Sequence, residues 1–181
     1  GLMDSTYLEM RIARSYALAG DTTTALTLYD DLFSRTNSDA TKSLILYRKG
    51  EIYTQLGQLD LAHQVYSDLV TQFPNSAYSY SALLTLVEAN IPVNELNRRL
   101  VDYYAGENGM SLTAVNRYLQ NQPEDPATAR YFTGLANRAL GGYDGAIQEW
   151  QTIIRDFPDH PYWDEAWDQV AYTQWYYQEQ Y

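Results

Sequence analysis

The sequence predicts an all-α protein, built of antiparallel helix pairs that stack into a right-handed superhelix of about ten helices, with strands essentially absent. Two observations predict this class. Amphipathic segments at helical spacing alternate with glycine- and proline-marked breaks, and a set of small, aromatic and proline residues returns at fixed intervals. Such self-similarity is typical of proteins in which each helix pair buries its apolar face against the next pair.

The clearest repeat relates residues 50–75 to residues 134–159, at a separation of 84 residues. The aligned residues are Gly50 and Gly134, Leu56 and Leu140, Gly57 and Gly141, Asp60 and Asp144, Ala62 and Ala146, Tyr66 and Trp150, and Phe73-Pro74 and Phe157-Pro158. A weaker copy at residues 13–33 precedes the first of these segments by 37 residues. Three copies predict a repeat protein.

Each repeat is expected to contain a turn between two helices. Gly57 and Gly141 stand where one amphipathic pattern ends and the next begins, so they are expected to adopt the left-handed conformation that ends a helix. Asp60 and Asp144 open the following helix. There a carboxylate can cap free N–H groups and meets the favourable end of the helix dipole.

Small residues let the two helices of a pair approach closely; these are Gly50, Gly134, Ala62 and Ala146. Tyr66 and Trp150 are expected to fill the space one turn further on. Pro74 and Pro158 then end the second helix, because proline cannot continue it. The conspicuous glycine, aromatic and proline spacing is therefore interpreted as helix packing rather than as a ligand-binding loop.

This pattern resembles the tetratricopeptide repeat, which has a Leu-Gly, Tyr, Ala, aromatic and Pro signature within about 34 residues. One array over residues 1–181 is expected, as a piece of a longer protein, with repeats near 6–37, 43–76, 92–123 and 127–160 and the start of another at 161–181. The repeat at 92–123 is degenerate. Arg99 stands at its small position, while Ala114 and Tyr118 keep the alanine and aromatic positions.

Composition excludes several classes of function. The formal charge of −11 repels phosphate backbones, so nucleic acid is not an expected partner. The absence of cysteine removes disulfides, thiolate metal sites and thiol nucleophiles, and it leaves the compartment open. No apolar run reaches the length that a membrane span needs.

No catalytic residue, cofactor site or metal ligand is predicted. The richest acidic cluster is His160 with Asp164 and Asp168, which could hold a cation, but the acidic residues after Pro161 are interpreted as complementing a helix N-terminus. With two histidines and no glycine-rich phosphate loop, neither a catalytic triad nor a nucleotide site can be assembled. We therefore expect this chain not to be an enzyme.

The segments "FPNSAYSYSALLTLVEANIPVNELNRRLVDYYAG", "YLQNQP" and "GGYDGAIQEWQTIIRDFPDHPYWDEAWDQVAYTQW" also resemble the helical superhelix region of bacterial soluble lytic murein transglycosylases. The resemblance implies a periplasmic or cell-surface location and a non-catalytic role in access to peptidoglycan glycan strands. The family's catalytic Glu-Ser pair has no counterpart, because none of the nine glutamates precedes a serine. The alternative is a general scaffold for protein or peptide partners, linked to no enzyme, for which the cytoplasm also remains open.

In the tetratricopeptide register, six first-helix residues are expected to face the concave groove, and they are Tyr47, Glu51, Thr54, Tyr131, Leu135 and Arg138. The two tyrosines are equivalent positions that could stack on a sugar or hold a peptide, or could be exposed without consequence. Other tyrosines, including Tyr16, Tyr29, Tyr53 and Tyr66, are assigned to packing. The aromatic C-terminal helix, with Trp167 and Trp175, is expected to associate with another surface.

Overall fold

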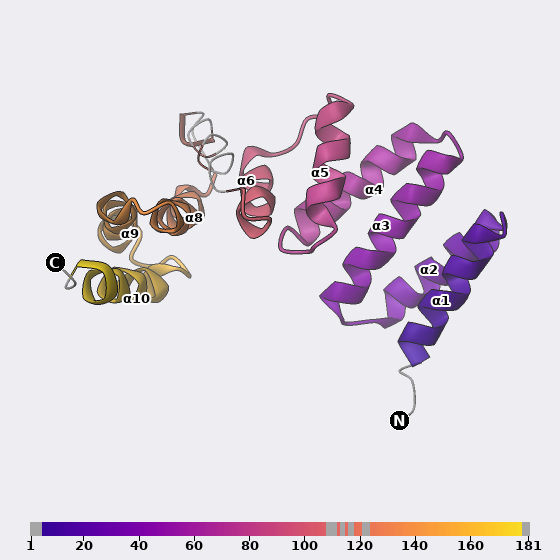
Figure 1. Cartoon of the computed structure of the whole chain (residues 1–181), viewed down its shortest axis with the longest axis horizontal. Coiled ribbons are helices and arrows are strands. Elements are labelled where there is room, and N and C mark those ends of the chain that lie inside the picture. Colours follow the sequence, from indigo (N-terminus) through magenta and orange to yellow (C-terminus); the bar gives the residue numbers. More distant parts are fainter. Residues whose placement is uncertain (1–4, 108–111, 113–114, 116–117, 121–123, 179–181) are drawn as a thin grey trace. The chain divides into compact units, whose positions relative to one another are not determined.

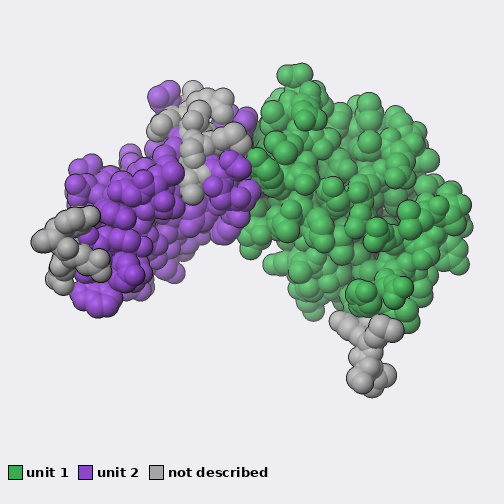
Figure 2. Space-filling model, viewed as in Figure 1, with its two compact units in different colours: residues 1–93 green, residues 94–181 purple. Residues whose placement is uncertain are grey.

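A computed structural model describes residues 5–107, 112, 115, 118–120 and 124–178 of the chain. These residues include nine continuous α-helices, one short π-helix and further helical residues at 112, 115 and 118–120, and they contain no strand (Figure 1). The chain divides into two compact units, residues 1–93 and residues 94–181, and each is described by itself (Figure 2). The predicted all-α class of helix pairs is confirmed.

The first unit holds two complete helix pairs and the first helix of a third (Figure 1). Its helices are α1 (Ser5–Leu18), α2 (Thr22–Arg35), α3 (Asp39–Gln55), α4 (Leu59–Gln72) and α5 (Ser79–Glu88). Helix α1 packs on α2 and α3 packs on α4, while α5 packs back on α4. The first pair and α3 together enclose an apolar core that includes Ala13, Tyr29 and Ile45.

Glycine turns join the helices within each pair. Gly20 and Gly57 have φ angles of +87° and +70°, in the left-handed region where a side chain would be strained. The predicted capping by Asp60 is wrong, because the N-cap residue of α4 is Gln58 and Asp60 lies inside the first turn. Asp60 can therefore favour α4 only through the helix dipole. A true side-chain cap occurs in α2, where Asp21 accepts a hydrogen bond from the Thr24 N–H at 3.1 Å.

Small residues bring paired helices together as predicted. A Cβ atom built on Gly50 would lie only 2.3 Å from the ring of Tyr66, so the ring occupies the space that glycine leaves open. In the second unit the same test on Gly134 gives 2.4 Å to the indole of Trp150. Trp150 is fully buried, and its indole N–H donates to the Tyr131 carbonyl at 3.1 Å.

The second unit repeats this plan, with helices α6 (Glu95–Tyr104), α8 (Pro126–Ala139), α9 (Tyr143–Asp156) and α10 (Trp163–Thr173), continued by the π-helix η1 (Gln174–Gln178). Helices α8 and α9 form the pair, and α10 packs on α9. Gly141 turns the chain at a φ of +81°. The N-cap residue of α9 is Gly142, and Asp144 lies in the first turn, at the favourable end of the helix dipole as predicted.

The degenerate repeat places a charge in the core. Arg99, at the position held by Gly50 and Gly134 elsewhere, is completely buried and donates to the Ala129 carbonyl of α8. Burial lowers the pKa of Arg99 to about 9. Ala114, predicted at the alanine position of the second helix, lies outside the described residues; Tyr118 is described, and its hydroxyl accepts from the Asp125 N–H at 2.9 Å.

Two tyrosines predicted to pack do so less completely than expected. Tyr29 and Tyr66 are buried, but Tyr16 is 41% exposed and Tyr53 is half-buried. Tyr16 therefore corrects the expectation that repeat-position tyrosines belong to the core. One continuous right-handed array over residues 1–181 stays a prediction, since each unit is described alone.

Candidate functional site

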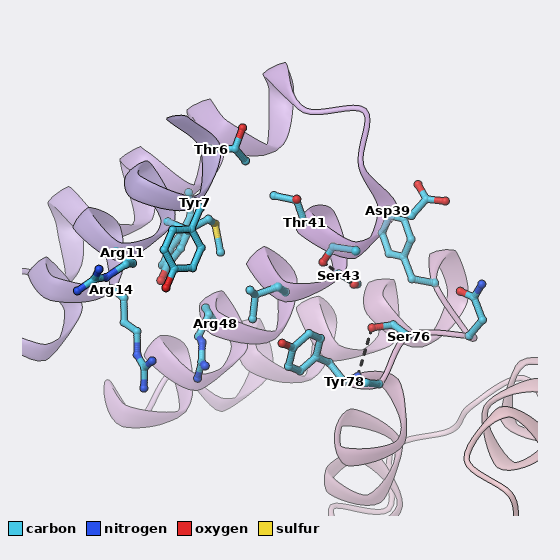
Figure 3. A pocket seen from close by; sticks show the side chains of 17 residues that line it. Thr6, Tyr7, Arg11, Arg14, Asp39, Thr41, Ser43, Arg48, Ser76 and Tyr78 are labelled. Atoms are coloured by element: carbon cyan, nitrogen blue, oxygen red, sulfur yellow. Dashed lines mark hydrogen bonds between the residues drawn. The ribbon is translucent and has the colours of Figure 1, made fainter. Parts of the chain in front are cut away.

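A hollow of about 690 Å³ opens between α1, α3 and the segment that joins α4 to α5 (Figure 3). We call it the α1–α3 groove. Its lining residues include Tyr7, Met10, Arg11 and Arg14 of α1, Asp39, Ser43, Leu44 and Arg48 of α3, and Phe73, Ser76, Ala77 and Tyr78 of the joining segment. Because first helices form two of its sides, the groove lies where stacked repeats are expected to present a concave binding surface.

A second hollow of about 320 Å³ continues along the same two helices. It is lined by Leu18 of α1 and by Glu51 and Ile52 of α3. Both hollows share Arg14 and Arg48, which line them together with the side chain of Tyr29. These three residues therefore stand at the junction of the two hollows.

Helix α1 contributes two arginines to the groove. Arg11 and Arg14 are three residues apart, which places them on neighbouring parts of one helix face. The guanidinium of Arg11 lies 5.9 Å from the centre of the Tyr7 ring, a cation–π distance. Arg14 has no hydrogen bond or ion pair to any residue that the structure describes. Its charge is available to a ligand.

Helix α3 contributes Arg48, whose side chain is only 25% exposed. Its Nη1 lies 2.6 Å from Oε2 of Glu51, one turn further along α3. Between the helices, Tyr29 is almost completely buried. Burial raises the pKa of the Tyr29 hydroxyl, and the positive charges of Arg48 and Arg14 oppose that rise. Both guanidinium groups thus act electrostatically on the same buried hydroxyl.

The third wall of the groove is held in a fixed conformation. The hydroxyl of Ser79 donates to the Phe73 carbonyl at 2.6 Å, and the Tyr78 N–H donates to the hydroxyl of Ser76 at 3.2 Å. The Tyr78 ring stacks on Tyr47 of α3, with ring centres 5.2 Å apart. Hydrogen bonds and ring stacking within the chain therefore hold the polar and aromatic side chains that bound the groove.

Of the predicted groove residues in the first unit, Glu51 lines one of these two hollows, and Tyr47 and Thr54 line neither. Tyr47 is half-buried behind Tyr78, and it supports the wall rather than facing the cavity. Thr54 is exposed and its hydroxyl donates to the Gly50 carbonyl at 2.8 Å. Glu51 thus lines the second hollow and Tyr47 lies beside the α1–α3 groove, while a role for any of the three residues in binding stays a prediction.

The three predicted residues of the second unit are engaged in packing. Tyr131 is only 9% exposed and stacks on Tyr162 with ring centres 4.3 Å apart. Leu135 packs against the core of the unit. The guanidinium of Arg138 donates to the Gln169 Oε1 at 2.6 Å and lies 5.3 Å from the centre of the Trp150 ring. Ligand binding by these residues stays a prediction.

Arg14 and Arg48 were not among the groove residues predicted from the sequence. They are 34 positions apart in the chain, and the repeat brings their helices together. A signal was present: Arg11, Arg14 and Arg48 all fall on predicted first helices, in a chain with only twelve basic residues. Asking which charges share first-helix positions would have found them.

The acidic cluster near the C-terminus does not form a metal site in the described part of the chain. There, no group of three His, Cys, Asp or Glu side chains is arranged to hold a metal ion. His160 instead lies 3.3 Å from Asp125, whereas Asp164 and Asp168 are exposed. Among the described helices, none is both long and apolar enough to cross a membrane.

The C-terminal helices carry exposed aromatic rings. Trp167, Tyr172, Trp175 and Tyr176 are each more than 40% exposed, while Tyr177 stacks on Tyr143 with ring centres 4.4 Å apart. A group of four exposed large aromatic rings is unusual on the surface of a monomeric protein and is typical of an interaction site. Association through this helix stays a prediction.

Family models of the tetratricopeptide repeat match residues 7–35 and 45–76 and, in a second version, residues 100–161. Together these matches cover about two thirds of the chain. The chain belongs to the tetratricopeptide-repeat family. The matched segments include α1–α4 of the first unit and the α8–α9 pair of the second, so the predicted family resemblance is confirmed.

Two curated proteins are similar in sequence. The chain is 26% identical over 151 residues to the outer membrane protein assembly factor BamD of Pasteurella multocida, and 28% identical over 147 residues to that of Haemophilus influenzae. Each match covers 70% of this chain and 52% of the relative, so the chain spans about half the length of the curated relatives it matches.

Among solved structures, the chain is similar to the tetratricopeptide-like repeats of a kinesin light chain-like protein from Podospora anserina. The identity is 12% and the TM-score 0.39, with 98% of this chain and 91% of the other covered. Nothing among these matches supports the predicted resemblance to lytic murein transglycosylases.

Proposed function

We propose that this chain is a non-catalytic protein-interaction scaffold of the bacterial cell envelope, and that the α1–α3 groove receives an extended segment of a partner protein. The observation that carries the proposal is the groove itself. It is an open hollow of about 690 Å³ between two first helices, with apolar, aromatic and charged side chains in its walls. That mixture suits a peptide, which presents backbone, apolar and polar groups together.

The envelope location rests on the two relatives, both named as outer membrane protein assembly factors. Because the chain spans about half of each relative, the proposal concerns a binding role and not the whole activity of those proteins. The accessory role beside a lytic transglycosylase, with peptidoglycan as the ligand, has no support among the matches. We therefore favour a protein partner.

The proposal can be tested by site-specific photo-crosslinking in bacterial cells that export the chain. A benzoylphenylalanine at Tyr7, which lines the groove and is 56% exposed, should capture an envelope protein. The matched control is the same substitution at Tyr16, which lies on the same helix and is 41% exposed but does not line the groove. We expect the Tyr7 product to be absent or much weaker at Tyr16.

A second variant tests whether the groove itself is occupied. Ala77 is exposed and lines the groove, so Ala77→Trp should fill part of the hollow without disturbing the core. It should abolish the crosslink from Tyr7 while leaving the thermal unfolding temperature unchanged. Equal crosslinking from both tyrosines, or a Tyr7 product that survives Ala77→Trp, would contradict binding in the groove.

A further inference from the structure

We propose that the segment bound in the α1–α3 groove carries an internal acidic side chain, and that Arg14 and Arg48 bind its carboxylate at the junction of the two hollows. This inference rests on the proposed function and names the chemistry of its partner. The occupant is an extended, internal stretch of another protein with a glutamate or aspartate, flanked by apolar residues that contact Met10, Leu44 and Tyr78.

The first support is the free charge of Arg14. Its guanidinium lines both hollows and has no hydrogen bond or ion pair within the described residues. Most other arginines in the first unit have anionic partners: Arg35 lies 2.6 Å from Glu9 and 2.7 Å from Asp31, and Arg48 pairs with Glu51. A guanidinium is the side chain best suited to bind a carboxylate with two parallel hydrogen bonds.

The second support is the setting of Arg48. The side chain is three-quarters buried, and in such a partly desolvated position a charge interacts more strongly than on an open surface. Glu51 accepts a hydrogen bond from Nη1 of the guanidinium, at one edge of the planar group. The planar group has five N–H donors, so it can bind a second carboxylate or exchange Glu51 for it. Glu51 is therefore a built-in competitor for the incoming acid.

Charge also gives the groove a direction. Figure 3 shows Arg11, Arg14 and Arg48 toward one end of the hollow and Asp39 at the opposite end. The arginine end is exceptional in a chain with a formal charge of −11, where an acidic partner would otherwise be repelled. A bound segment is accordingly expected to place its acidic residue at the arginines and a neutral or basic residue near Asp39.

The second hollow indicates an internal acid rather than a chain terminus. Beyond Arg14 and Arg48 lies the second hollow, which has a volume of about 320 Å³ and is lined by Leu18 and Ile52. A segment whose last residue ended at the arginines would leave this space unused. A segment that passes through can place apolar residues there, and its carboxylate then belongs to a side chain.

The test uses capped synthetic peptides of one host sequence, rich in Leu, Tyr and Ser, with Glu, Gln or Lys at the centre. Binding to the whole chain is measured by fluorescence anisotropy. The Glu peptide should bind at least about tenfold more tightly than the Gln peptide, and the Lys peptide more weakly still. A fourth peptide, with a central Gln and a free C-terminal carboxylate, should bind no better than its capped form.

Variants of the protein are expected to change binding of the Glu peptide in opposite directions. Arg14→Gln and Arg48→Gln should each reduce the preference for Glu over Gln by several-fold. Glu51→Gln should increase affinity for the Glu peptide, because it removes the competitor of Arg48. Arg155→Gln is the matched control: it changes the net charge by the same amount, its partner is Asp156, and it lines neither hollow. It should leave binding unchanged.

The outcomes separate this inference from the proposed function. Equal binding of Glu and Gln peptides, still blocked by Ala77→Trp, would overturn the acidic partner while retaining a peptide groove. Tighter binding of the free C-terminal carboxylate would overturn the internal placement. A loss of Glu-peptide affinity in Glu51→Gln would overturn the proposed binding of the acidic side chain by Arg48. Glu51 would then be a ligand-binding residue rather than a competitor. Failure of every peptide to bind, with no Tyr7 crosslink, would reject the proposed function as well.

Discussion

Equivalent repeat positions line an open groove in the first unit and are buried in the second. Phe132 follows Arg48 by 84 residues, the repeat separation. Arg48 lines an open groove, whereas Phe132 is buried, with its ring centre 5.4 Å from Tyr103 and 5.9 Å from Tyr162. Likewise Arg14, next to the small residue of its helix, faces the groove, while Leu100, next to Arg99, packs against the core. The repeat pattern fixes how paired helices pack, but it leaves this first-helix face free either to bind or to be covered.

Exchanging these residues is expected to have the largest effect. Phe132→Arg should reduce the free energy of unfolding by about 4 kcal/mol or more, because it removes a buried ring and adds a charge without a partner. The new charge would also lie close to Arg99, whose guanidinium is 6.0 Å from the Phe132 ring centre. Urea denaturation of the purified chain measures this loss.

Two control variants make that exchange informative. Phe132→Leu keeps an apolar side chain and should cost less than about 1.5 kcal/mol. Arg48→Phe should cost less than about 1 kcal/mol, because it removes only a partly exposed ion pair, yet it should abolish the preference for a Glu peptide. If Phe132→Arg were as stable as Phe132→Leu, the face of the second unit would be open as in the first.

The units also differ in the charges that they bury. The buried polar side chains of the first unit are Ser43 and Ser79, whereas the second unit buries Asp102 as well as Arg99. Neither carboxylate oxygen of Asp102 has a hydrogen-bond partner among the described residues. Burial raises the pKa of Asp102 from 3.8 to about 6, against the opposing charge of Arg98 and with that of Glu107.

This shift predicts a stability that falls as the pH rises. Below pH 3.8 the carboxyl is neutral in both folded and unfolded chains, and between 3.8 and about 6 the unfolded chain loses its proton first. Asp102→Asn removes this pH-dependent loss of stability. The variant should be more stable by about 2 kcal/mol at neutral pH, but not in acid. Urea denaturation across this range measures the difference; an equal effect at both ends would point to packing instead of titration.

An effect of similar size is expected from the close helix contact that the two units share. Gly134→Ala should destabilise by about 2 kcal/mol, because the new Cβ would lie 2.4 Å from the Trp150 indole. Gly145→Ala is the matched control in α9, where the nearest atom, of Asn137, is 3.4 Å away and helix propensity favours alanine. Gly50→Ala should behave like Gly134→Ala. Thermal unfolding that ranked Gly145→Ala with the other two would remove the close helix contact from both repeats.

The smallest effect concerns helix capping. Asp21→Ala should cost about 1 kcal/mol, because it removes the side-chain acceptor of the Thr24 N–H. Asp60→Ala should cost only a few tenths of a kcal/mol, because Asp60 acts through the helix dipole alone. Equal losses on thermal denaturation would show that first-turn aspartates cap their helices after all.

The sequence was sufficient to predict the helix pairs because their determinants are local or periodic. The left-handed turns at Gly57 and Gly141 follow from glycine at the end of an apolar pattern. The close contact of Tyr66 with Gly50 follows from volume complementarity at repeated spacing. Capping was predicted less well: Asp60 lies two positions beyond the N-cap residue Gln58, a shift that spacing alone does not resolve.

The candidate site was predicted only in outline. First-helix residues were expected to form the groove, and α1 and α3 do so. Of the residues predicted in the first unit, Glu51 lines the second hollow, whereas Tyr47 stacks on Tyr78 beside the groove. Because a helix face is wide, one position along α3 separates Tyr47 from the lining residue Arg48. The burial of Tyr131 depends on Tyr162, a contact between successive repeats that no single helix reveals.

The two tyrosine stacks have a consequence for how the protein opens. Tyr47 on Tyr78 and Tyr131 on Tyr162 are the same contact repeated after 84 residues, and each links the first helix of one pair to the start of the next. Nearest-neighbour contacts of this kind make a repeat protein behave as a chain of coupled elements. Amide protons of a pair should then exchange with solvent together with those of its neighbour, so that release of α5 loosens the wall of the groove before the α1–α2 pair unfolds.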